Sequence, residues 1–399
     1  MTGTTIAQAI PIAISPILTR IYTPEDFGIF ALYMSIVSIV SVIATGRYEM
    51  AIMLPKKEED AINIVVLSSI ISIFISFISF IIIFLFNNEI TNILATPEIS
   101  IWLYFIPIAV LSTGIYQSLN YYINRKKEYK LLAINRVTQS GLTSLSTLAL
   151  GFGGLGSAGL IFGGIVGKVG ATSILARLVL KNDSKILHKV KVIKMYILAK
   201  RYIKFPKYDI LASASNISAQ QVTHILFNIL FSSTTAGYYY LTQRIIGLPI
   251  TFIASAISDV FREQASTDYN KYKNAKNIYT RTFFKLMLLS FFPSIFIYIF
   301  AIDIFTIIFG KEWSIAGEYA QILTPMLFLR FISSPLSFML YIGEKQQLNL
   351  FGNLLFLFLT LLCFYLADTA IDTVYLLSCS YSFIYILYIY FSAKIAKVF

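Results

Sequence analysis

Apolar stretches of about 20 residues recur along the chain and are separated by short polar connections. Four of them, at 27–46, 61–88, 99–124 and 373–393, contain no charged residue. A helix needs about 20 apolar residues to cross the hydrocarbon core of a bilayer, so the pattern predicts an all-α polytopic membrane protein. We expect about twelve transmembrane helices, at 2–19, 27–46, 62–86, 101–123, 131–150, 154–177, 208–231, 238–259, 283–301, 315–341, 349–367 and 372–393.

The first apolar segment, 2–19, is interpreted as a retained span. It lacks the basic start and the small-residue cleavage site of a secretory signal peptide. It is followed by eleven further candidate spans.

Positive charge alternates between the connections. The loops after the even-numbered spans contain Lys56, Lys57, Arg125, Lys126, Lys127, the basic run at 181–207, the stretch 262–276 and Lys345. The other loops contain only Arg20 and Lys311. Because cytoplasmic loops collect Lys and Arg, this pattern predicts that both termini face the cytoplasm.

The longest polar stretch lies near the middle of the chain. Residues 181–207 are too few for a catalytic domain and predict a basic cytoplasmic linker between a six-helix lobe at 1–180 and a second at 208–399. The two halves show weak similarity in the same order, which predicts a parallel repeat. Lobes of this kind typically surround a central cavity in transporters.

The composition agrees with a membrane protein. Hydrophobic residues make up 57% of the 399 residues and charged residues 13%, about half the share in soluble domains. The formal net charge of +12 belongs mainly to the cytoplasmic loops and suits anionic lipids. No motif for nucleic acid accompanies it, and the two cysteines have no spacing that suggests a metal or a disulfide.

The cations that we single out within or near the ends of the expected spans are Arg136, Lys168, Arg244 and Arg330. A charge at the bilayer centre costs roughly 2.5–3.5 kcal/mol on insertion scales. The spans hold few carboxylates to pair with these cations, so we predict a cationic, water-filled cavity. The alternative for Arg136 and Arg244 is that their side chains reach back to the cytoplasmic interface.

Polar residues also recur at helical spacing. Asn216, Gln220, His224 and Asn228 follow one another at intervals of four, which places them on one helix face. Such stripes line a hydrophilic path or connect helices by hydrogen bonds. We expect a path, to which Gln8, Asn120 and Gln139 also contribute.

Glycines are concentrated at 151–170. The run resembles a phosphate-binding loop but lacks its Gly-Lys-Ser/Thr ending. The four-residue spacing of Gly159, Gly163 and Gly167 is typical of closely packed membrane helices. We therefore predict helix packing or a flexible bend here.

No nucleophile–base pair, metal motif or nucleotide-binding fold is visible, so we expect neither an enzyme nor a cofactor. Transport would then depend on the gradient of an ion or of the substrate. Glu49, Asp259 and Glu318 are the candidate coupling carboxylates.

Several motifs resemble a known family. They are SPILTRIYTPEDFG at 15–28, ATGRYEMAIMLP at 44–55, AGYY at 236–239, QRIIGLP at 243–249 and AISDVF at 256–261. The chain resembles the Wzx-type O-antigen and polysaccharide repeat-unit flippases. These form the polysaccharide transporter family of the multidrug/oligosaccharidyl-lipid/polysaccharide exporter (MOP) superfamily.

The resemblance implies a cargo and a location. The cargo would be an undecaprenyl-pyrophosphate-linked oligosaccharide repeat unit, moved from the cytoplasmic to the periplasmic leaflet of a bacterial inner membrane. The product would enter O-antigen or surface polysaccharide biosynthesis. Membrane lipids, a polysaccharide polymerase and a chain-length regulator are the expected partners, with no nucleic acid.

Two other functions remain open from the sequence. A multidrug or small-cation exporter of the same superfamily would favour acidic residues in its cavity. A membrane polysaccharide polymerase or glycosyltransferase would need a large external loop or a donor-binding carboxylate motif.

Overall fold

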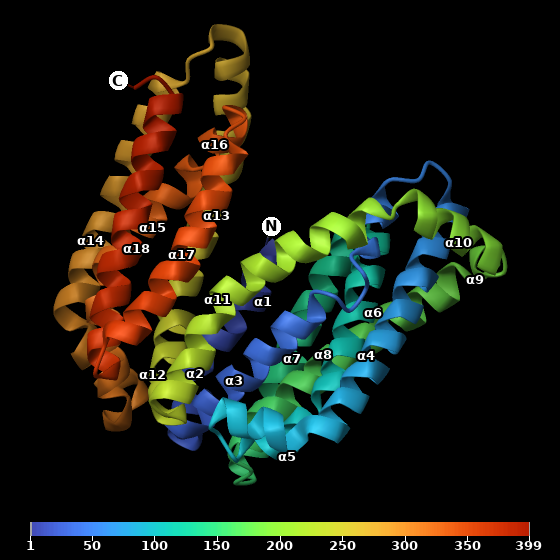
Figure 1. Cartoon of the computed structure of the whole chain (residues 1–399), viewed down its shortest axis with the longest axis horizontal. Coiled ribbons are helices and arrows are strands. Elements are labelled where there is room, and N and C mark those ends of the chain that lie inside the picture. Colours follow the sequence, from blue (N-terminus) through green and yellow to red (C-terminus); the bar gives the residue numbers. More distant parts are fainter. Residues whose placement is uncertain (1, 399) are drawn as a thin grey trace. The chain divides into compact units, whose positions relative to one another are not determined.

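The computed structural model describes the backbone of residues 2–398, without the side chains of residues 2, 4, 248, 249, 251, 252, 346 and 350. Over this part of the chain every regular element is a helix (Figure 1). The α-helices are α1 (Thr2–Ala13), α2 (Ser15–Ile21), α3 (Pro24–Ser41), α4 (Glu58–Leu94), α5 (Ile99–Leu103), α6 (Ile106–Arg125), α7 (Tyr129–Phe152), α8 (Ser157–Asn182), α9 (Ser184–Leu187), α10 (Val192–Arg201), α11 (Ile210–Leu230), α12 (Ser233–Thr242), α13 (Leu248–Tyr272), α14 (Lys276–Phe309), α15 (Ser314–Leu336), α16 (Met339–Ile342), α17 (Gln346–Leu366) and α18 (Ala370–Ile395). Short 3-10 helices lie at Tyr48–Met53 and Lys311–Trp313, and π-helical segments at Phe205–Asp209 and Gln243–Gly247.

All twelve expected spans coincide with helices, which confirms the all-α fold. Among the described residues, eight helical segments are long and apolar enough to cross a membrane. They are Pro24–Ser41, Glu58–Leu94, Ile99–Arg125, Ser157–Asn182, Lys276–Phe309, Lys311–Ile342, Gln347–Leu366 and Ala370–Ile395. The other four expected spans correspond to α1–α2, α7, α11 and α12–α13. The α1–α2 segment is apolar but shorter than 18 residues. The other three carry polar stripes or an internal cation, which lowers their hydropathy.

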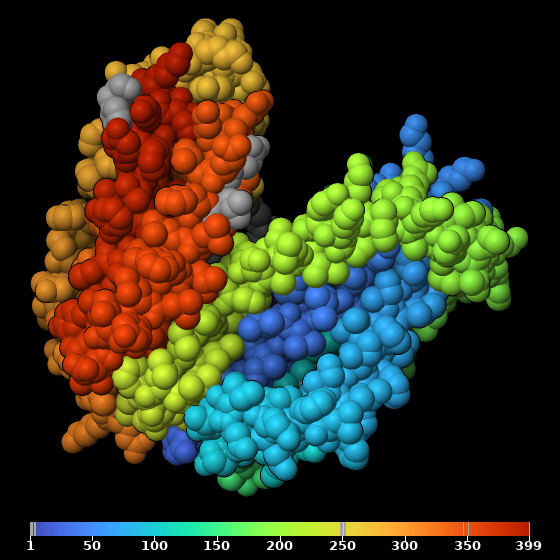
Figure 2. Space-filling model, in the orientation of Figure 1, coloured from blue at the N-terminus to red at the C-terminus, as the bar shows by residue number. Residues whose placement is uncertain are grey.

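The chain forms two compact units, Met1–Gly237 and Tyr238–Phe399. The first unit includes the residues expected to form the linker, 181–207, and the seventh expected span, α11. The α11 helix packs along α3 (Figure 2), and Ser35 of α3 donates a hydrogen bond to Gln221 of α11 at 3.0 Å. The lobes at 1–180 and 208–399 therefore stay a prediction of the sequence pattern.

The long α4 helix shows how a span is built for lipid. Large apolar side chains such as Phe74, Phe77 and Phe84 are exposed, whereas Ser68 and Ser76 are buried. The Ser68 hydroxyl is 2.8 Å from that of Ser118 on α6, and Ser76 donates to the Pro107 carbonyl at 2.7 Å. Small polar residues at the interface allow close packing and add hydrogen bonds between spans.

Glycines bring several helices of the first unit together. A Cβ atom on Gly163 of α8 would lie 2.9 Å from the backbone of Thr147 on α7, and one on Gly167 would lie 2.9 Å from the backbone nitrogen of Thr143. A Cβ on Gly159 would overlap the Tyr22 hydroxyl. The prediction that this glycine run serves helix packing is confirmed.

The lysine-rich ends of α4, α6 and α8 are held by ion pairs. Lys126, which follows α6, pairs with Asp183 after α8 and with Glu58 at the start of α4, the latter at 3.3 Å. Partial burial alone would lower the pKa of Lys126, but its bonds to Asp183 and Glu58 outweigh that effect and raise the pKa. Glu59 pairs with Lys189 at 2.6 Å and with Lys194 of α10 at 3.1 Å.

Candidate functional site

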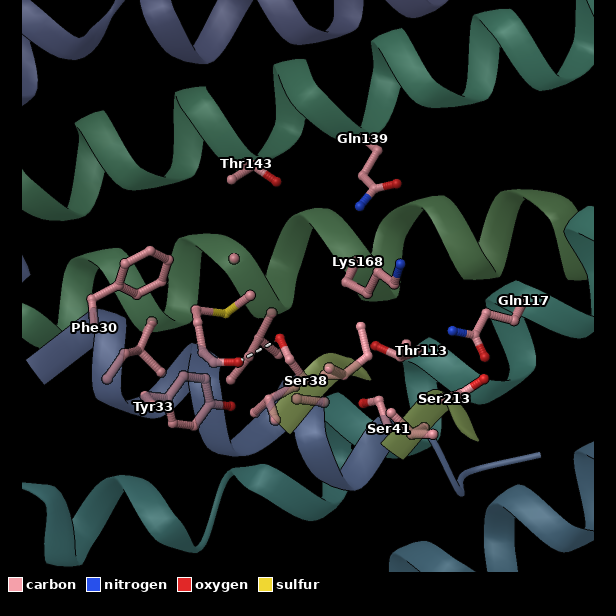
Figure 3. Close-up of a pocket in the computed structure, with 18 of the residues that line it drawn as sticks. Phe30, Tyr33, Ser38, Ser41, Thr113, Gln117, Gln139, Thr143, Lys168 and Ser213 are labelled. Carbon is pink, nitrogen blue, oxygen red and sulfur yellow. Dashed lines mark hydrogen bonds between the residues drawn. The ribbon is translucent and has the colours of Figure 1, made fainter. Parts of the chain in front are cut away.

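A cavity of about 590 Å³ lies inside the first unit (Figure 3). Its walls come from α3, α6, α7, α8 and α11, together with the turn after α3. The polar side chains in the wall are Ser38, Ser41, Thr113, Gln117, Gln139, Thr143, Ser213 and Asn216, and the cations are Arg47 and Lys168. Phe30 and Tyr33 supply aromatic rings at the wall formed by α3.

Lys168 projects from α8 into the space bordered by Thr113, Gln117 and Gln139 (Figure 3). Its ammonium nitrogen lies 3.9 Å from the centre of the Tyr116 ring, a cation–π distance. Among the described residues, no carboxylate lies within 4.0 Å of this ammonium group. The cavity therefore contains one positive charge that no protein anion compensates.

Tyr116 links this lysine to a second cation. The side chains of Arg136 and Asn120 lie close to that of Tyr116, whose ring faces Lys168. Tyr116 is almost fully buried. Arg136 and Asn120 thus lie behind the cavity wall, one side chain away from Lys168.

Arg47 is the cavity cation that the sequence analysis did not select as a site residue. It follows Gly46, and both residues have left-handed backbones, with φ of 60° and 59°. Its guanidinium group is 3.2 Å from Glu49 and 2.5 Å from Asp209. Glu49 is buried and also accepts a hydrogen bond from Thr45. The available signal was two opposite charges, Arg47 and Glu49, two residues apart at the end of an apolar span.

The Ser41 hydroxyl is another lining group that the sequence analysis passed over. The residue is 6% exposed, and its oxygen has no hydrogen-bond partner within the described part of the chain. A buried polar atom without a partner is rare in folded proteins. Because Ser41 lines the cavity (Figure 3), a ligand or water there can supply the missing bond.

Three of the eleven predicted path residues line this cavity: Lys168, Gln139 and Asn216. The polar residues along α11 have different roles at the two ends of the helix. Asn216 is exposed and accepts a hydrogen bond from Gln220 at 2.6 Å. Asn228 is buried and donates to the carbonyl oxygens of His224 at 3.0 Å and Gly28 at 3.4 Å, so it contributes to helix packing.

Four predicted site residues lie in the second unit. Arg330 is half-buried and close to Tyr239 and Tyr385, whose ionisation it influences. Arg244 lies in the π-helical segment Gln243–Gly247. Glu318 is half-buried beside Tyr319, and Asp259 is exposed on α13. Whether these four contribute to the same transport path stays a prediction, as it does for Gln8 of α1, which is half-buried.

The fold is shared with solved membrane transporters. The chain matches an inward-facing multidrug resistance MATE family transporter of the MOP superfamily with a TM-score of 0.74 and 13% identity, over 100% of this chain and 95% of that one. It matches the lipid II flippase MurJ with a TM-score of 0.73 and 14% identity, over 99% and 88% of the two chains. A MOP superfamily transporter from Pyrococcus furiosus, described as having a binding pocket of reversed polarity, matches with a TM-score of 0.65 and 14% identity over 100% and 94%.

At these identities the likeness shows the fold, which is that of an all-α MOP-type transporter. No curated protein sequence matches the chain. A family model for polysaccharide biosynthesis proteins matches residues 17–317, about three-quarters of the chain. With eight helical segments long and apolar enough to cross a membrane among its described residues, the chain is a multi-pass membrane protein with the fold of these transporters, and it belongs to the polysaccharide biosynthesis protein family.

Proposed function

We propose that this protein flips an undecaprenyl-pyrophosphate-linked oligosaccharide repeat unit from the cytoplasmic to the periplasmic leaflet of a bacterial inner membrane. The observation that carries the proposal is the cavity of the first unit, which combines an uncompensated Lys168 with a wall of amide and hydroxyl groups. Membership of the polysaccharide biosynthesis family supports a glycan as cargo.

The chemistry of the wall suits both parts of such a head group. A pyrophosphate is an anion that the Lys168 ammonium group can bind without first breaking an ion pair. Sugar hydroxyls both donate and accept hydrogen bonds, which matches Gln117, Gln139 and Asn216. The rings of Phe30 and Tyr33 offer apolar surfaces to the C–H faces of sugar rings.

We further propose that the Arg47 ion pairs couple transport to an ion gradient. Glu49 and Asp209 place two carboxylates against the single positive charge of Arg47. Binding of a coupling cation to this group would cancel the excess negative charge and favour an anionic head group in the cavity. Of the three predicted coupling carboxylates, Glu49 is the one beside the cavity.

The same proposal places both termini in the cytoplasm and assigns the polymerase and chain-length regulator as downstream partners. It needs no enzymatic step and no cofactor.

A multidrug exporter is the main alternative, since the fold is shared with a MATE transporter. A cavity built to attract cationic drugs would be expected to contain uncompensated carboxylates, whereas here the carboxylates beside the cavity, Glu49 and Asp209, are both paired with Arg47.

The test is to deplete the protein in its native host and locate lipid-linked sugars by leaflet. We expect complete single repeat units to accumulate facing the cytoplasm and to decline again on re-expression. Single repeats that reach the periplasm without polymerising would favour a polymerase. Unchanged lipid-linked sugars would favour drug or ion export.

The predicted cations are tested in the same assay. Alanine variants of Arg136, Arg244 and Arg330 should each reduce export. Normal export in all three variants would remove their proposed role in the path.

A further inference from the structure

The segment between α8 and α11 forms a defined structure on the lysine-rich end of the first unit. Met195 and Leu198 of α10 are buried, and Leu198 belongs to the core formed with α4, α6 and α8. The Asn63 side chain accepts a hydrogen bond from the backbone of Lys191 at 3.0 Å, and the Tyr48 hydroxyl donates to the Ala199 carbonyl at 3.0 Å. With the Glu59 ion pairs, these contacts hold α10 against the first turn of α4 (Figure 1).

The opposite face of α10 is apolar and uncovered. Val192, Ile193, Tyr196 and Ile197 are between 58% and 78% exposed, and their spacing places them on one side of the helix. Lys200 lies four residues after Tyr196 and three after Ile197, so it continues the same face of the helix. Four large apolar side chains on one short helix are unusual at a surface that faces water.

Positive charge surrounds this apolar face. Residues 181–209 contain nine lysines and arginines and two aspartates. The two aspartates are already engaged, Asp183 with Lys126 and Asp209 with Arg47. Lys200, Arg201, Lys204 and Lys207 are exposed, and no carboxylate pairs with them among the described residues.

The position of α10 relative to the spans defines what its outer face meets. The helix that contains the α4 span begins at Glu58 and the helix that contains the α8 span ends at Asn182, so α10 lies beside the lysine-rich ends of these two helices. An amphipathic helix with an apolar face and flanking lysines is typical of the boundary between head groups and acyl chains.

We propose that α10 lies in this boundary, with Val192, Ile193, Tyr196 and Ile197 inserted between lipids, and that Lys200, Arg201, Lys204 and Lys207 bind the phosphates of anionic phospholipids. Lysines and arginines near an anionic leaflet attract its negatively charged head groups. The apolar side chains insert α10 into the bilayer surface, and the four cations make it select negatively charged head groups. The inference is independent of the cargo, because it uses no residue of the cavity.

The test uses the full chain in lipid nanodiscs. Ile193→Cys, in a background of Cys363→Ser and Cys379→Ser, carries a bimane fluorophore. Quenching is compared between brominated phosphatidylglycerol and brominated phosphatidylcholine, each as a minor part of the same mixed bilayer. We expect both lipids to quench, with phosphatidylglycerol about twofold more effective because the cations enrich it locally.

The charge variant combines Lys200→Gln, Arg201→Gln, Lys204→Gln and Lys207→Gln. It should keep quenching by phosphatidylcholine and lose the preference for phosphatidylglycerol. A matched control removes four exposed cations elsewhere, with Lys56→Gln, Lys57→Gln, Lys271→Gln and Lys273→Gln, and should retain the preference. If the fourfold variant does not accumulate, Lys200→Gln with Arg201→Gln should at least halve the preference.

Three results would overturn the inference. Absence of quenching by either lipid would show that the apolar face does not reach the bilayer. If both brominated lipids quenched equally in the protein that keeps Lys200, Arg201, Lys204 and Lys207, α10 would contact the bilayer without a preference for anionic lipids. A preference that survives the charge variant would mean that other residues select the lipid.

Discussion

The positive charge of Lys168 is expected to lower the stability of the protein and to bind the anionic part of the cargo. Its ammonium group lies in a membrane-spanning helix over the Tyr116 ring, without a carboxylate partner in the described structure. An uncompensated charge at such a site destabilises the protein when no ligand is bound. Stability and transport should therefore respond to its removal in opposite directions.

For Lys168→Met we expect roughly a 10- to 100-fold loss of export, since a charge-assisted hydrogen bond contributes about 1.5–3 kcal/mol. Lys168→Arg keeps the charge and should retain a substantial part of the activity. The thermal unfolding temperature of Lys168→Met in detergent should equal or exceed that of the unmodified protein. Unimpaired export in Lys168→Met would refute its role in binding, and a lower unfolding temperature would indicate a folding defect instead.

Arg47 and Glu49 should depend strongly on one another. Arg47→Ala leaves Glu49 buried without its charged partner, which costs about 3–5 kcal/mol when a buried pair is broken. Adding Glu49→Gln to Arg47→Ala should restore about 1–3 kcal/mol of the free energy of unfolding. A double-mutant cycle on unfolding in mixed micelles measures this coupling, and additive effects would show that the ion pair contributes little.

At the scale of helices, the α7–α8 contact positions the cavity wall. Gln139 and Thr143 belong to α7 and Lys168 belongs to α8. The separation of the two helices therefore determines how far the Lys168 side chain lies from those of Gln139 and Thr143. The close approach depends on Gly163 and Gly167.

Gly163→Ala should separate α7 from α8 and lower both stability and export, because its Cβ would lie 2.9 Å from backbone atoms that cannot move independently. Gly141→Ala on α7 is the matched control, since nothing lies within 4 Å of a Cβ at that position. It should be neutral or stabilise by up to about 1 kcal/mol through helix propensity. Comparing the unfolding temperatures of the two variants checks the prediction, and equal effects would contradict it.

The helices are predictable from local properties of the sequence. Apolar length and loop charge are local properties, so all twelve expected spans coincide with helices. The membership of α11 in the first unit depends instead on contacts such as Ser35–Gln221 and Asn228–Gly28, which join residues almost 200 positions apart. Sequence spacing carries no information on such pairs.

Part of the candidate site was predictable, because some of its residues stand out by a local property of the sequence. Lys168, Gln139 and Asn216 stand out because polar residues are costly within apolar helices. Arg47 lies in a turn at the end of a span, where charge is ordinary. Gly46 and Arg47 have left-handed backbones, and the Arg47 side chain lines the cavity. Backbone conformation of this kind is not visible in hydropathy.

At the scale of the whole molecule, the loop charges predict a topology that can be measured directly. Alkaline phosphatase fused after Lys207 or at the C-terminus should be inactive, because both sites are expected in the cytoplasm, where the enzyme does not form its disulfides. A fusion after Lys311 should be active. Activity at the C-terminus would contradict the predicted cytoplasmic position of that terminus.

The turn at Gly46 and Arg47 also limits how freely evolution can vary this protein. Arg47 adopts φ of 60°, a conformation that glycine and asparagine reach readily and that β-branched residues almost never adopt. A relative with glycine or asparagine at this position can keep the turn while losing the guanidinium group and its ion pairs. A relative with valine, isoleucine or threonine there would have to rebuild the turn. One alignment column can therefore sort relatives into those that preserve this cavity and those whose cargo site must be built differently.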